Sequence, residues 1–290
     1  MSLLNAWPMG FYHPATLIKD AMRHGVEFRP IDVQTSGVRC RWEERVGRGP
    51  AGAVRLGLKF VRGLRRQAAL AIEEEQLRGP FRCLDDLAQR TRLRADELET
   101  LAEIGALANI HGSDGARNPL TRRAALWQVA RVGRPAGPLL EELPDENPSP
   151  LPEMTAIEQT VADFAGTQLT LGPHPIRYLR EALQKRGVIP NADLPRYNHG
   201  DRVRAAGSVI VRQRPGTAKG MLFLTIEDET GMIQAIVSQE LLQRERKTIV
   251  GSSGLAVEGL LQRRDGTLAI RAEKFWPVQD LVRIPSYDFR

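Results

Sequence analysis

Polar and apolar residues alternate over five short stretches in the last third of the chain, as they do in half-buried β-strands. A run with helical spacing, 238–247, follows the third stretch. Five strands with a helix between the third and the fourth form the order of an OB-fold barrel, which we expect over residues 201–278. The predicted strands are Arg202–Arg212, Met221–Glu227, Met232–Val237, Leu255–Arg263 and Thr267–Trp276.

Residues 53–132 carry apolar side chains at three- and four-residue spacing, which predicts helices, with glycine turns at Gly63 and Gly105. Glycine accepts positive φ, and the N–H groups of the helix after it form an anion site. This is the design of a helix-hairpin-helix, which grips duplex DNA by its backbone. Glycine turns also occur in ordinary helical bundles, but the cations around Gly63 favour nucleic acid. Glu99 and Glu103 lie near the second turn, which we expect to be structural.

We expect a multidomain α+β protein, and the remaining segments are predicted to form its smaller parts. Residues 1–52 form a partial body, with a helix over Ala15–Arg23 and a short strand over Val26–Val33. We expect the charged, glycine-rich stretch 41–53 to be a loop.

A proline-rich, acidic linker is predicted over 133–156, because proline interrupts both helices and strands. Residues 157–200 are expected to be a connecting segment, with helices over Thr155–Phe164 and Ile176–Arg186. Residues 279–290 form a C-terminal tail. No Lys or Arg occurs from Pro135 to Ile176, so this spacer would not adhere to DNA.

Charge supports a polyanionic partner, since the net charge of the 290 residues is +6. The candidate residues for DNA binding are cationic or aromatic residues of the first hairpin and the barrel loops: Lys59, Arg62, Gly63, Arg65, Arg66, Arg212, Arg214, Lys219, Phe223, Arg263 and Arg264. We expect the hairpin to take duplex and the barrel to take a single strand. Phe223 is placed to stack on a base, or else it faces the barrel core.

No enzymatic constellation stands out. The five histidines are scattered, and there is no phosphate-binding loop with Lys-Ser/Thr and no Asp-x-Asp pair in an apolar strand. The acidic run at Glu227–Glu229 is better explained as a turn between strands than as a metal site. We therefore predict no catalytic residue, metal or cofactor in this chain. Cys40 and Cys83 lie far apart, and no apolar run spans a membrane, so we expect a cytoplasmic protein.

Several stretches resemble bacterial C-family DNA polymerases of the error-prone, alpha-subunit type. Leu3–Pro14 and Arg29–Val33 resemble their fingers region, and Leu56–Leu64 and Gly79–Leu87 resemble their helix-hairpin-helix segment. The most specific stretch is Val211–Gly220, continuing into Leu224–Gly231. The chain thus resembles the C-terminal portion of such an enzyme.

This resemblance implies a DNA-directed DNA polymerase used in damage-induced translesion synthesis, with mutagenesis accessory proteins as partners. In the family the palm, with its catalytic aspartates and Mg²⁺, precedes the stretch that begins here, so we expect the chain to be inactive alone and to need a palm-bearing fragment. Gln168 departs from the family's glycine. Gln168–Leu171 superficially matches a sliding-clamp peptide, but no aromatic residue follows, and the family register explains it better.

Two alternatives remain open: a free-standing nucleic-acid-binding protein, and a module that docks partner proteins through the barrel and the helix of the 240s.

Overall fold

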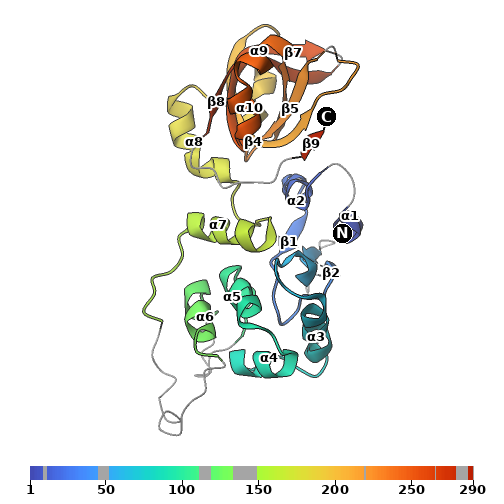
Figure 1. Cartoon of the computed structure of the whole chain (residues 1–290), viewed down its shortest axis with the longest axis vertical. Coiled ribbons are helices and arrows are strands. Elements are labelled where there is room, and N and C mark those ends of the chain that lie inside the picture. Colours follow the sequence, from blue (N-terminus) through green and yellow to red (C-terminus); the bar gives the residue numbers. More distant parts are fainter. Residues whose placement is uncertain are drawn as a thin grey trace. The chain divides into compact units, whose positions relative to one another are not determined.

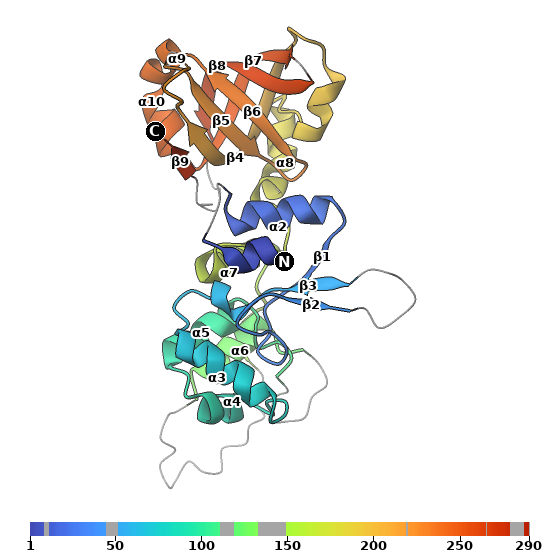
Figure 2. The same cartoon turned by 90° about the vertical axis from the view of Figure 1, so that its right-hand side faces the viewer.

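The computed structural model describes residues 1–8, 12–44, 52–110, 119–132, 149–218, 220–264, 266–278 and 287–289 (Figures 1 and 2). Most of the predicted linker and tail, and Lys219, lie outside these residues. The chain forms two compact units. The helical unit comprises Met1–Met9 and His24–Leu171, and the barrel unit comprises Gly10–Arg23 and Gly172–Arg290.

A small sheet belongs to the helical unit, with the strand order β1-β3-β2. Strand β1 (Glu27–Arg29) is parallel to β3 (Ala53–Arg55), and β2 (Arg41–Glu43) is antiparallel to β3. The expectation of a loop over 41–53 was therefore wrong at both of its ends. Glu43, one of the charges that suggested a loop, forms cross-strand pairs: it accepts hydrogen bonds from Arg55 Nε and Arg29 Nη1, each at 2.7 Å. Hydrogen bonds from Arg55 lower the pKa of Glu43.

Short helices make up the rest of the helical unit (Figure 1). They are α1 (Ser2–Ala6), the 3₁₀ turn η1 (Leu58–Phe60), α3 (Arg66–Gln76), α4 (Leu84–Thr91), α5 (Ala95–Glu103), α6 (Arg122–Val129) and α7 (Ala156–Thr167). Each longer helix buries one apolar stripe, as with Leu98 and Leu101 on α5. The predicted helical pattern is confirmed, except that it begins with strand β3 and that turns, not helix, follow Gly105.

Helix α7 packs tightly against the second glycine turn. A Cβ on Gly166 would lie 2.3 Å from Ile104 Cγ2, so a side chain there would force the helix away. Arg122 covers the same turn, with its Nη1 donating to Glu103 O at 3.0 Å and to Asp163 Oδ1 at 2.7 Å. The second turn is therefore interior to the unit, in agreement with its predicted structural role.

The barrel unit has the predicted five-stranded barrel, with the strand order β5-β6-β8-β7-β4 closed by pairing of β4 with β5 (Figure 2). Strands β6 and β8 are parallel, and the other neighbours in the barrel are antiparallel. The strands are β4 (Arg202–Gln213), β5 (Leu222–Glu227), β6 (Met232–Val237), β7 (Gly254–Arg264) and β8 (Thr267–Pro277). Around them lie α2 (Pro14–Arg23), α8 (Pro175–Lys185), η2 (Asn191–Arg196), α9 (Gln239–Arg244), α10 (Arg246–Gly251) and β9 (Tyr287–Phe289).

Alternating residues of every barrel strand face one apolar core, for example Leu222, Leu224 and Ile226 of β5. The predicted helix over 238–247 is two short helices, whose Leu241 and Ile249 belong to the same core.

The acidic turn at the end of β5 is held by Asp228, which is fully buried. Its Oδ1 accepts the N–H groups of Thr230 at 2.8 Å and Gly231 at 3.0 Å. Its Oδ2 accepts from Arg180 Nη2 at 2.8 Å and from Asn191 N at 2.9 Å. The interpretation as a turn is confirmed, and the carboxylate ties α8 and η2 to the barrel.

Closure of the barrel needs glycine at a β-bulge in the β7–β8 pairing. A Cβ on Gly259 would lie 2.0 Å from Arg271 O, whereas one on Gly231 would meet no atom within 4 Å. We predict that Gly259→Ala lowers the free energy of unfolding of the barrel unit by about 2 kcal/mol, through overpacking. The matched control Gly231→Ala should change it by less than about 0.5 kcal/mol. Urea unfolding followed by tryptophan fluorescence measures both, and equal values would contradict the packing argument.

Candidate nucleic-acid interface

The first hairpin turns at Gly63, whose φ is +77° and around which a Cβ would meet no atom within 4 Å. The backbone N–H groups of Gly63 and Leu64 donate to no acceptor among the described residues. They precede the N-terminus of α3, where the helix dipole favours an anion. The turn therefore has the open N–H groups that a phosphate requires.

Two of the predicted hairpin cations serve the fold. Lys59 Nζ donates to the carbonyl oxygens of Leu4, Asn5 and Trp7 at 3.4, 3.1 and 2.9 Å, so it caps the C-terminal end of α1. Arg65 makes a bidentate pair with Glu97, through Nε at 2.9 Å and Nη2 at 2.8 Å.

Glu97 is a buried carboxylate with 1% of its surface exposed. It also accepts the backbone N–H groups of Arg65 and Arg94, each at 2.9 Å. Burial opposes ionisation, but the hydrogen bonds from Arg65 and Arg94 outweigh it and lower the pKa of Glu97 to about 2. This carboxylate fastens the hairpin to the start of α5.

Arg62 and Arg66 stay on the surface of the hairpin. Arg62 is exposed, although its N–H and its Nη1 donate to Gly166 O at 2.7 Å and Ala165 O at 3.3 Å. Arg66 is exposed and has no hydrogen bond or ion pair from its side chain within the described parts of the chain.

Arg92 is a cation that the sequence analysis missed. It ends α4 in the left-handed conformation, with φ of +51°, and its carbonyl oxygen accepts from Arg65 Nη2 at 3.2 Å. The backbone of this exposed residue therefore lies beside the Arg65 side chain of the hairpin. Nothing in the local pattern signals this, because residue 92 comes near Arg65 only through the fold.

On the barrel, Phe223 lies on the outer face of β5, because its neighbours Leu222 and Leu224 occupy the core. The alternative that Phe223 faces the core is therefore wrong. The pairing registers place Gln213, Phe223, Ile236 and Arg271 side by side on β4, β5, β6 and β8. We call these four residues the barrel row.

Arg271 was not among the predicted residues. It is exposed, and within the described residues its guanidinium forms no ion pair or hydrogen bond. A strand pattern assigns it to a surface, but its place next to Ile236 depends on the parallel pairing of β6 with β8, which links distant segments.

Two predicted barrel cations are structural. Arg212 is only 6% exposed, and its Nε and Nη2 donate to Ile249 O at 3.1 Å and Ser252 O at 2.5 Å, which fastens α10 to the barrel. Arg263 Nη2 donates to the carbonyl oxygens of Pro195 and Tyr197, the latter at 3.2 Å. Arg214 and Arg264 are exposed, and no described residue pairs with their guanidinium groups.

No group of three or more His, Cys, Asp or Glu side chains with the arrangement of a metal site occurs in the described part of the chain. None of the helices described there has the length and apolar character needed to cross a bilayer.

Family comparisons match both units. Residues 25–116 match a helix-hairpin-helix motif, and residues 203–278 match an OB-fold nucleic acid binding domain. The chain is 44% identical to an error-prone DNA polymerase of Alkalilimnicola ehrlichii, over 91% of this chain and 25% of that protein. Those of Pseudomonas syringae pv. syringae and Pseudomonas aeruginosa are 39% and 41% identical, over 100% and 90% of this chain and 28% and 24% of theirs.

The chain is homologous to error-prone DNA polymerases. It spans about a quarter of the length of these curated relatives. Among solved structures, asparaginyl-tRNA synthetase from Pyrococcus horikoshii aligns over 34% of this chain and 23% of the synthetase chain. The sequence identity is 24% and the TM-score is 0.26.

The ionised Glu97 should stabilise the helical unit in a pH-dependent way. Its pKa in the fold, about 2, lies below the ordinary value of 4.5, so the stabilisation is complete above about pH 4.5 and is lost as the pH falls towards 2. We predict that Glu97→Gln lowers stability by about 3 kcal/mol at pH 7 and by progressively less at lower pH. The exposed Glu99→Gln on the same helix is the control.

Hydrogen exchange of peptides from the hairpin and α5, measured from pH 7 down to pH 3 after correction for the intrinsic rate, tests this prediction. A difference between Glu97→Gln and the wild type that does not shrink with falling pH would contradict it.

Proposed function

We propose that this chain is the DNA-holding part of an error-prone polymerase, with duplex product on the first hairpin and single-stranded template on the barrel. The observation that carries the proposal is the barrel row, an aromatic ring and an unpaired arginine in register on the outer face of an OB-fold. Its context is the homology to error-prone DNA polymerases over 90–100% of the chain.

The geometry of the row suits a single strand. Neighbouring strands lie about 4.8 Å apart, so Arg271 is about 10 Å from Phe223, two strands away. A base stacked on Phe223 would leave the phosphate of an adjacent nucleotide within reach of the long Arg271 side chain. Stacking contributes about 1–3 kcal/mol per base and tolerates every base, as a polymerase template requires.

Two exposed loop cations extend this path. Arg214 follows directly after Gln213 at the end of β4, and Arg264 ends β7. A cation that neutralises a phosphate releases a bound counterion, so this contribution is independent of sequence and weakens with salt. Lys219 of the same β4–β5 loop remains part of the proposal, as a further phosphate contact.

The hairpin is proposed to hold the duplex by its backbone. The N–H groups of Gly63 and Leu64 would donate to one phosphate, and Arg62, Arg66 and Arg92 would surround it with positive charge. Lys59 and Arg65 contribute indirectly, because they position the hairpin.

Phosphoryl transfer is assigned to the rest of such a polymerase. We propose that its catalytic aspartates and Mg²⁺ lie in a palm outside this chain, and that the assembled enzyme copies damaged templates in the cytoplasm together with mutagenesis accessory proteins. The polymerase homology supports this assignment. A free-standing nucleic-acid-binding role would use the same two surfaces without a palm.

The barrel row is tested by fluorescence anisotropy with labelled oligo(dT) over a salt series. We expect Phe223→Ala to weaken binding about tenfold through loss of stacking. The triple change of Arg214, Arg264 and Arg271 to Ala should reduce the salt slope by about 2, at about 0.7 for each phosphate of a single strand. The control is Arg177→Ala, an exposed arginine of α8. Unchanged affinity and slope in the row variants would refute the single-strand site.

The hairpin is tested with a blunt duplex and the same oligo(dT). Gly63→Val should weaken duplex binding about tenfold and leave oligo(dT) binding within about twofold, because a β-branched residue resists positive φ and covers the open N–H groups. Gly25→Val introduces the same strain at φ +84°, also in open space, and is the matched control. If both variants lose both ligands, the cause is unfolding; if Gly63→Val binds duplex like the wild type, the hairpin is not the duplex site.

A further inference from the structure

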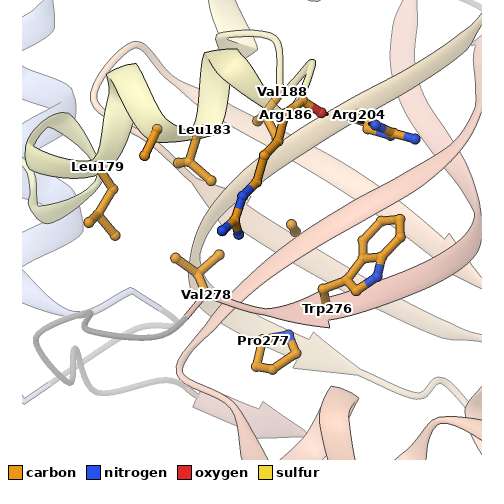
Figure 3. Close-up of a pocket in the computed structure, with 10 residues that line it drawn as sticks. Leu179, Leu183, Arg186, Val188, Arg204, Trp276, Pro277 and Val278 are labelled. Atoms are coloured by element: carbon orange, nitrogen blue, oxygen red, sulfur yellow. Dashed lines mark hydrogen bonds between the residues drawn. The ribbon is translucent and has the colours of Figure 1, made fainter.

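A second surface of the barrel unit carries a cavity of about 630 Å³ between α8 and the strands β4, β7 and β8. Figure 3 shows Leu179 and Leu183 of α8 on one side and Trp276, Pro277 and Val278 of β8 and its end on the other. The cavity includes no residue of the barrel row, so the proposed DNA site does not account for it.

The two arginines at the cavity differ in whether their guanidinium groups are already paired. Arg204 is already engaged, because it pairs with Glu258 and its Nη1 donates to Arg186 O at 2.9 Å. The side chain of Arg186 extends into the cavity (Figure 3), and its guanidinium forms no hydrogen bond or ion pair with any described residue. Among the described residues that line the cavity there is no carboxylate.

Trp276 adds an aromatic side with positive charge around it. Lys274 Nζ and Arg204 Cζ lie 5.0 and 5.9 Å from its ring centroid. Because Glu258 neutralises Arg204, the positive charge at the rim of this apolar cavity comes from Arg186 and Lys274. Such a rim complements an acidic ligand that also has an apolar group to bury.

A nucleobase fits these walls poorly. Its edge carries donors as well as acceptors. The described side chains that line the cavity offer donors, from arginine and the tryptophan indole, and no acceptor. An aliphatic or aromatic side chain of a protein leaves no polar group unsatisfied against Leu179, Leu183 and Val278. An adjacent carboxylate would then meet Arg186.

We propose that this cavity docks a short acidic segment of a partner protein, which inserts one apolar side chain and places an Asp or Glu on Arg186. The guanidinium holds a carboxylate in a planar, two-point geometry, which gives direction to an otherwise unspecific apolar contact. Small apolar anchors of this kind, surrounded by a charged rim, are a common form of partner docking.

The full chain is panned against a phage-displayed library of random short peptides. Phage that also bind the variant Ala182→Trp are removed, because this exposed position on α8 lines the cavity and a tryptophan would fill it. We expect the enriched peptides to share an apolar residue beside Asp or Glu. If Ala182→Trp does not fold, Ala182→Glu serves instead, since its carboxylate would form an ion pair with the Arg186 guanidinium and block the peptide's carboxylate.

An enriched peptide is then measured by anisotropy. Arg186→Glu should weaken its binding about tenfold. Arg177→Glu, the same charge change on α8 but outside the cavity, should leave binding within about twofold. The proposal is overturned if no peptide is enriched, if the enriched peptides are basic, or if the two variants behave alike. It is also overturned if oligo(dT) displaces the peptide, which would make the cavity a nucleic-acid site.

Discussion

Arginine side chains connect the elements of both units by donating to buried carboxylate and carbonyl oxygens, and the pair of Arg65 with Glu97 shows most clearly what depends on them. Glu97 is almost fully buried, and an ionised carboxylate there would be very costly without its donors. Because Arg65 and the N–H groups around it supply those donors, the hairpin and α5 have one fixed relationship. Arg122, Arg180 and Arg212 do the same for the second turn, for α8 and for α10.

This use of arginine divides the positive charge of the protein into two classes. One class is consumed by the fold and is not available to a ligand. The other is exposed and unpaired among the described residues, and it includes Arg66 and Arg92 in the helical unit and Arg214, Arg264 and Arg271 on the barrel. A net charge of +6 therefore says less about binding than the positions of the few arginines that the fold leaves free.

The two proposed DNA surfaces and the cavity beside α8 separate three tasks in one chain. Backbone contacts at the hairpin would not depend on DNA sequence, and stacking on Phe223 would tolerate any base. A peptide bound at Arg186 would contact neither the hairpin nor Phe223. With such separation, occupation of one surface would leave the others open.

The order of the barrel strands and both glycine turns could be predicted from the sequence, because alternation, helical spacing and positive φ are local properties of a few consecutive residues. The roles of individual cations could not. Arg65 and Glu97 are 32 positions apart, and Arg212 and Ser252 are 40 apart, so the pattern around each arginine contains no trace of its acceptor. The same holds for the small sheet of the helical unit, for Arg271 beside Ile236, and for the cavity under α8. Each of these arises where segments distant in the sequence pack together. The free energy of that packing depends on burial and on hydrogen-bonded polar groups, and both are established only when the chain folds.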